Sequence, residues 1–163
     1  MRSQTLFAAL ALFLLFSGCD NAGDEPGTGT SPGLSLVGTY TLVSLQDVTG
    51  EVTTIPNRVL LAGVPNPITI PSGPDQGVLV TFVITGELTL TGQSYTADIT
   101  INSSANGQSS TSQDSEAGSY VVDGTTMTLN PDFDNEDSVI SWTLVQNRLT
   151  LSDSETILVY QKR

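Results

Sequence analysis

The stretch Val78–Thr91, VLVTFVITGELTLT, determines the expected fold of this chain. Apolar and polar side chains alternate along it with a period of two, which is the pattern of a β-strand with one face in a core and the other in water. Gly86 falls on the apolar parity, so the segment is either one bent strand or two strands joined by a tight turn. The apolar parity holds Val78, Val80, Phe82, Ile84, Leu88 and Leu90.

The same period of two continues through most of the chain from Leu36 onward, and no convincing period of 3.6 is present. Many short strands joined by hairpins predict an all-β, antiparallel up-and-down barrel of about 8 to 10 strands, because closure removes exposed sheet edges. The further segments expected to be strands are Leu36–Gln46, Glu51–Ile55, Tyr95–Asn102, Ser119–Val122, Thr125–Asn130, Val139–Val145, Arg148–Ser152 and Thr156–Lys162.

Two regions interrupt this alternation. Five of the eight prolines lie from Pro56 to Pro74, and since proline cannot donate to a sheet, we expect a covering loop with short edge pieces there. The stretch Ser103–Gly118 is rich in Ser, Gln, Asn and Gly, and its low complexity predicts a mobile loop. Asp123-Gly124 is a favoured pair for a two-residue hairpin turn.

The N-terminus has the parts of a bacterial signal peptide. Arg2 supplies a positive start, and residues 6–16 are all Leu, Ala or Phe. Eleven such residues are too few to span a bilayer core of about 30 Å at about 1.5 Å per residue. The sequence Leu15–Cys19, LFSGC, resembles the lipoprotein box, which implies lipid attachment at Cys19. An ordinary signal peptide followed by an accidental cysteine is the alternative.

This pattern divides the chain into three parts. Residues 1–18 are expected to be the lipoprotein signal peptide, 19–35 the lipidated Cys19 with a flexible acidic tether, and 36–163 the β-barrel domain. Almost every residue from 20 to 33 is polar, Gly or Pro, a composition that cannot bury enough apolar area to fold. We therefore expect a protein of the bacterial cell envelope, lipid-anchored to a membrane and either periplasmic or surface-exposed.

The charge balance excludes several classes of function. The chain has 17 acidic and 5 basic residues, a formal net charge of −12 and no histidine. Five scattered basic residues cannot form the stripe that binds phosphates, so we expect no nucleic-acid partner. Without histidine, the chain has neither a Ser-His-Asp triad nor an imidazole ligand for a metal.

The carboxylates offer no recognisable catalytic or metal site. Four acids crowd residues 132–137, but the spacing lacks the glycine and the final glutamate of an EF-hand. Glu87 and Asp98 fall on the polar parity of their strands and are expected to face water rather than a cleft. We therefore expect no enzyme activity, no catalytic residues, no metal and no cofactor.

The opening of the barrel region, Leu36–Ser44 or LVGTYTLVS, resembles the first strand of bacterial lipocalin-like domains, which carries a Gly-Thr-Trp/Tyr-x-Leu-x-Ser pattern. The hairpin Gly118–Leu129, the Trp142 strand and residues 159–162 resemble that family in type and order. The resemblance implies an eight-stranded or similar barrel whose interior either holds a small apolar ligand or is filled by side chains. The META-like envelope domains open in the same way and are the alternative.

A small apolar ligand inside the barrel is the expected function. Every second residue of a closed barrel points inward, and the Tyr40 hydroxyl and the Trp142 indole could orient the polar end of a ligand. The alternative is an envelope protein-interaction or structural module with a filled core and an exposed apolar patch; the sequence indicates no particular protein partner. The candidate ligand-lining residues are Tyr40, Phe82, Ile84, Leu88, Leu90, Ile99 and Trp142.

Replacing Cys19 with alanine removes the thiol that would carry the lipid. We expect the Cys19→Ala protein to remain unprocessed or to be released in soluble form, because the apolar segment alone does not anchor the mature chain. Mass spectrometry of the mature N-terminus of the unaltered protein measures the same point directly. An unmodified N-terminus at any residue other than Cys19 would contradict lipid anchoring.

Overall fold

The computed structural model describes residues 35–48, 58–70, 76–133 and 137–163, and all of its regular structure is β-strand. The paired strands are antiparallel, in the order β2-β1-β10-β9-β8-β7-β6-β5-β4-β3, which confirms the predicted fold class and strand number. The strands are β1 (Gly38–Asp47), β2 (Arg58–Leu61), β3 (Asn66–Thr69), β4 (Leu79–Leu90), β5 (Ser94–Ala105), β6 (Gln108–Asp123), β7 (Thr126–Pro131), β8 (Ser138–Val145), β9 (Arg148–Ser152) and β10 (Thr156–Lys162).

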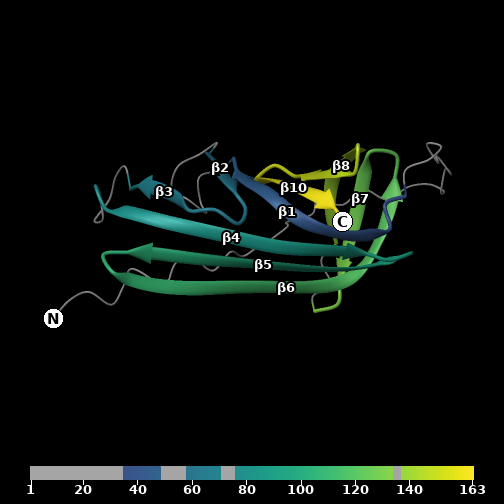
Figure 1. Ribbon diagram of the computed structural model, residues 1–163. Coiled ribbons are helices and arrows are strands. Elements are labelled where there is room, and N and C mark those ends of the chain that lie inside the picture. The colour runs from purple at the N-terminus through teal and green to yellow at the C-terminus, as the bar shows by residue number, and fades with distance from the viewer. Residues whose placement is uncertain (1–34, 49–57, 71–75, 134–136) are drawn as a thin grey trace.

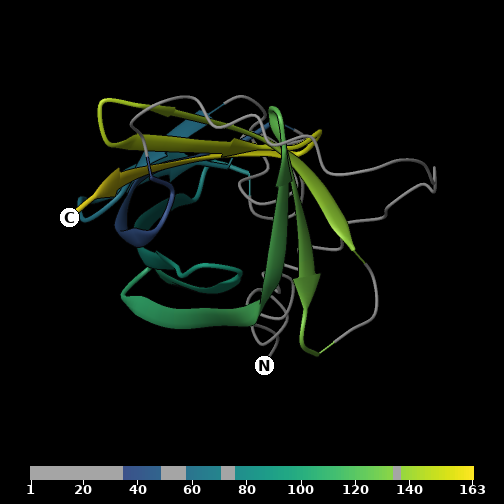
Figure 2. The same ribbon diagram turned by 90° about the vertical axis from the view of Figure 1, so that its right-hand side faces the viewer.

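A second pairing of β1 closes the sheet into a ring. Besides β10, β1 pairs with β4, through Gly38–Thr41 against Glu87–Leu90. The ring therefore runs through eight strands, β1 and β4 to β10, and is barrel-like, with the strands wrapped round one interior (Figure 2).

The strands β2 and β3 occupy the region where β1 and β4 separate. Beyond Thr41, β1 pairs with β2, while the first half of β4 pairs with β3. The buried Asn66 side chain of β3 bonds to the backbone of Leu61 in β2. Its Oδ1 accepts from the Leu61 amide at 2.9 Å, and its Nδ2 donates to the Leu61 carbonyl at 2.9 Å. The short edge pieces expected in the proline-rich region are thus β2 and β3, with Pro67 exposed on β3.

A β-bulge in β1 sets which residues enter the core. Tyr40 and Leu42 point inward, but the register against β10 shifts between Leu42 and Ser44. After this shift, Leu45 and Asp47 are the inward residues and both are almost fully buried. The simple alternation read from the sequence therefore changes parity inside β1.

Gly86 lies within a single continuous strand. It pairs with Ile99 in the middle of β4, so the bent-strand alternative is correct and no turn occurs there. A Cβ atom at Gly86 would lie 2.9 Å from the Asp98 carbonyl oxygen and 3.3 Å from the Leu42 Cβ. The glycine is needed because β1 and β5 both approach this point of β4.

The Ser/Gln-rich stretch is not a loop, and that prediction is wrong. β5 continues to Ala105, the turn Asn106-Gly107 has positive φ at both residues, and β6 begins at Gln108. The whole ladder from Ser94 to Ala105 pairs with β6, so backbone hydrogen bonds rather than apolar side chains define these strands. Figure 1 shows β4, β5 and the first part of β6 as long strands side by side, at a steep angle to the shorter β7 and β8. The last part of β6 bends and pairs with β7.

The β6–β7 turn lies one residue later than predicted. Asp123 pairs with Thr126, so the two turn residues are Gly124 and Thr125. Of these, Gly124 has a positive φ of 56°. Glycine takes the first central position because that position requires the left-handed backbone in such a turn.

Candidate functional site

The ring encloses a cavity of about 70 Å³ that is partly open to solvent. Seven of the eight ring strands, β4 to β10, contribute to its wall, and most of the lining is aliphatic. The wall is built by the inward parity of each strand, since directly opposed residues of an antiparallel pair share a face. The apolar lining residues are Leu88, Leu90, Ala97, Ile99, Met127, Leu129, Ile140, Leu151 and Leu158.

Two carboxylates, those of Glu116 and Asp153, lie in this mostly apolar wall. Glu116 of β6 is directly opposite Ala97 of β5, which in turn is opposite Leu88 of β4, so the Glu116 side chain is on the inward face. The Tyr95 hydroxyl donates a hydrogen bond to Glu116 Oε1. The cavity therefore contains a hydrogen-bonded acidic group among aliphatic side chains.

A second tyrosine lies beside this acid. Tyr160 of β10 also lines the cavity, and 1% of its surface is exposed. Burial raises the pKa of Tyr160 far above its ordinary value, and the nearby negative charge of Glu116 raises it further. Tyr160 is thus a neutral hydroxyl at physiological pH.

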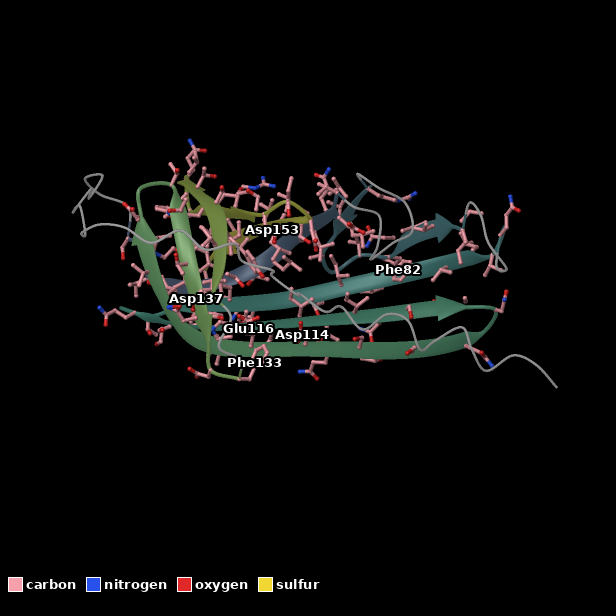
Figure 3. The ribbon with its side chains drawn as sticks, turned by 180° about the vertical axis from the view of Figure 1, so that it is seen from behind. Phe82, Asp114, Glu116, Phe133, Asp137 and Asp153 are labelled. Atoms are coloured by element: carbon pink, nitrogen blue, oxygen red, sulfur yellow. The ribbon has the colours of Figure 1, made fainter. Side chains whose placement is uncertain are left out.

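The β9–β10 turn forms the remaining polar wall of the cavity, through Ser152, Asp153 and Thr156. Asp153 Oδ1 accepts hydrogen bonds from the backbone amides of Glu155, at 2.6 Å, and Thr156, at 2.7 Å. These bonds fix the turn, as Asp commonly does through its own downstream amides. Figure 3 labels Asp153 at this turn, with Glu116 and Asp114 along β6 across the ring.

Two other tyrosines have their hydroxyls committed to backbone partners. The Tyr40 hydroxyl donates to the Leu36 carbonyl at 2.6 Å, and the Tyr120 hydroxyl donates to the Thr91 carbonyl at 2.8 Å. Burial raises the pKa of both hydroxyls, and for Tyr40 the neighbouring Tyr120 adds to the effect. Neither residue is part of the cavity wall.

The predicted lining residues fall into three groups. Leu88, Leu90 and Ile99 line the cavity. Tyr40 and Ile84 are fully buried in the core but outside the cavity wall, and Phe82 and Trp142 are half-buried and pack against that core.

Sequence reasoning missed most of the polar part of the site. Tyr95 and Tyr160 lie on the apolar parity of their strands, with Ile99 and Leu158, and this alternation could have identified them. Glu116 lies in the stretch predicted to be a mobile loop, so the strand alternation assigns it no parity.

Trp142 has an unusual environment for a partly buried indole. Its Nε1 atom is buried and has no hydrogen-bond partner among the described residues. Its backbone is held normally, because the amide donates to the Thr125 carbonyl at 2.9 Å and the residue pairs with Leu151. The indole therefore contributes apolar packing while its N–H is unsatisfied.

A larger hollow, of about 430 Å³, lies on the outer surface beside the β1–β4 junction. Glu87 and Asp98 are opposed across β4 and β5 there, and both face outward as predicted. The charges are partnered locally: Arg163 Nη1 lies 2.7 Å from Glu87 Oε2, and the Ser115 hydroxyl donates to Asp98. This exposed hollow lacks the enclosure of a ligand pocket.

In residues 35–48, 58–70, 76–133 and 137–163, no helix is long and apolar enough to cross a bilayer, and no group of three or more Cys, Asp or Glu side chains could hold a metal ion. Cys19, and Asp134 and Glu136 of the acidic segment, lie outside the described residues.

The strand pairing defines an all-β protein with a barrel-like ring of eight antiparallel strands. No protein-family model matches the chain, and no curated protein matches it. Among solved structures, the chain is similar to an uncharacterized protein from Bacteroides eggerthii, with a TM-score of 0.45 and 12% identity over 79% of this chain and 100% of that chain.

Substitutions at Trp142 test the described environment of its indole. Trp142→Phe should change the free energy of unfolding by less than about 1 kcal/mol, because the lost ring area is offset by removal of an unsatisfied buried N–H. Trp142→Ala should cost roughly 2 to 4 kcal/mol through lost packing. Urea unfolding followed by circular dichroism measures both. A Trp142→Phe cost above about 2 kcal/mol would show that Nε1 has an acceptor.

Proposed function

We propose that this chain is a lipid-anchored module of a bacterial cell envelope that binds a small, largely apolar molecule inside its barrel-like ring, and that it is not an enzyme. The observation that carries the proposal is the apolar cavity bounded by β4 to β10, with Glu116 and Tyr160 in its wall. Apolar pockets with a few convergent polar groups are the usual form of small-molecule sites. The lipocalin-like features of Leu36–Ser44 and of the C-terminal hairpins support the same assignment.

The size of the cavity limits the ligand. A volume of about 70 Å³ is roughly half that of the 150 Å³ engineered cavity that binds benzene. Because the cavity is partly open, the site accommodates a few non-hydrogen atoms, or the end of a longer chain that projects into solvent. A molecule the size of a retinoid would require the ring to open.

The envelope location is supported by the sequence features of the N-terminus. The positive start, the short apolar segment and the small residues before Cys19 are those of a lipoprotein precursor. A chain anchored by lipid alone needs more than one acyl group to stay attached, which lipoprotein modification supplies. The strong negative charge of the chain would repel an anionic lipid surface, so attachment through Cys19 keeps the ring clear of the headgroups.

A protein-interaction module is the second candidate function. The small cavity means that most of the interior is filled by side chains, and apolar side chains are exposed on β2, on the residues after it and at the start of β4. Val59, Leu61, Val64 and Leu79 are each 43 to 55% exposed. Exposed apolar clusters are typical of protein-binding surfaces.

A cavity-filling substitution separates these two functions. Met127 lines the cavity and is the only methionine besides Met1, so its methyl NMR signal reports on this site. Neutral alcohols of about three to six carbons should shift that signal in the full chain. Ala97→Leu should abolish the shift because the new side chain fills the cavity.

The matched control is Thr96→Leu, one residue away on the outward, exposed face of the same strand, which should leave the shift intact. If no alcohol shifts Met127 in the unaltered protein, small-ligand binding is contradicted and the interaction module is favoured.

A further inference from the structure

The chemical character of the cavity wall narrows the class of ligand. Its charged members are Glu116 on β6 and Asp153 on the β9–β10 turn, both acidic. The four basic residues in the described part of the chain are placed elsewhere. Arg58 donates to the Pro67 carbonyl, Lys162 to the Ser35 carbonyl, Arg163 pairs with Glu87, and Arg148 begins the exposed end of β9.

We propose that the ligand of this cavity is a small cationic amphiphile, an apolar group carrying a protonated amine, with the ammonium bound by Glu116 and the apolar part held among the aliphatic side chains. This inference deepens the proposed function and rests on it. It points away from anionic amphiphiles such as fatty acids, because their carboxylate would face Glu116 and none of the described lining residues is a Lys or Arg that could pair with it.

The geometry favours Glu116 as the ammonium acceptor. A carboxylate has about four lone-pair sites, so it can accept from Tyr95 and still accept from a ligand. An ammonium has three donors and no acceptor, and its hydrogen bonds to a carboxylate are charge-assisted and stronger than neutral ones. Tyr95 acts as a positioning residue, because its bond restricts where the carboxylate lies.

The apolar part of the ligand has a defined place. Leu88 and Ala97 continue the row of opposed residues that ends at Glu116, so aliphatic surface begins directly beside the acid. Met127, Ile140 and Leu158 complete the apolar wall from β7, β8 and β10. An ammonium at Glu116 thus leaves its alkyl group inside the cavity.

The charge of the molecule supports the same ligand class. A formal net charge of −12 attracts cations toward the protein and lowers the local concentration of anions. Asp153, at the turn that borders the cavity, adds negative charge to the wall opposite Glu116 (Figure 3). Its Oδ1 is engaged with the turn amides, so it contributes to the potential and Glu116 supplies the contact.

Three probes of matched shape test the inference on the full chain: propylammonium, propan-1-ol and propanoate. Dissociation constants come from titration of the Met127 methyl signal. Propylammonium should bind at least about tenfold more tightly than propan-1-ol, and propanoate should bind more weakly than the alcohol. This comparison uses the unaltered protein, so it does not depend on whether any variant folds.

Glu116→Gln tests the residue itself. It keeps the side-chain shape and an acceptor for Tyr95 but removes the charge, so the preference for propylammonium should fall below about twofold while propan-1-ol binding is unchanged. Asp98→Asn is the matched control, since it removes one negative charge from the outer face of the same sheet and should leave the preference intact.

Two failures are distinguishable. If propan-1-ol shifts Met127 but the three probes bind alike, or if Asp98→Asn reduces the preference as much as Glu116→Gln does, the cationic ligand is overturned and the binding cavity stands. If none of the three probes shifts Met127, the proposed function fails, and this inference fails with it.

Discussion

The architecture depends on a short pairing between β1 and β4. Gly38–Thr41 pairs with Glu87–Leu90, and this contact joins the two ends of a meander that runs from β4 through β10 to β1. Without it, the described sheet would be open and would enclose no interior. The C-terminus adds to this junction, because the Arg163 guanidinium donates to Thr41 Oγ1 at 2.8 Å and pairs with Glu87. These groups are exposed, so the backbone ladder rather than the ion pair supplies most of the stability there.

The shortness of this pairing explains the rest of the fold. Because β1 and β4 separate after four residue pairs, their remaining halves need other partners, and the proline-rich segment supplies β2 and β3. Asn66 links these two short strands through its amide, which replaces a backbone partner for Leu61. Gly86 allows the close approach of β1 at the point of separation. The enclosed interior, and with it the cavity, follows from this arrangement.

Strand alternation was sufficient to predict the fold class and much of the meander. The predicted bounds of β9 and β10, Arg148–Ser152 and Thr156–Lys162, agree with the structure. The failures have physical causes: the parity change at Leu42 comes from a bulge, which has no sequence signature of its own, and the Ser103–Gly118 stretch forms strands through its backbone ladder with little apolar content. Since Glu116 lies in that stretch, this acid could not be assigned to the candidate site from the sequence, whereas the alternation does place Tyr95 and Tyr160 on the inward parity. Three of the predicted lining residues, Leu88, Leu90 and Ile99, do line the cavity.

The most direct test of this account is whether β1 and β4 pair in solution. Cross-strand NOEs in the full chain measure it, since directly opposed residues of an antiparallel pair bring their backbone protons together. The account predicts NOEs between Thr39 and Thr89, whose hydroxyl oxygens lie 3.3 Å apart, and between Thr41 and Glu87. Absence of these NOEs, with the β1–β10 and β4–β5 NOEs present, would show an open sheet and contradict the closed ring.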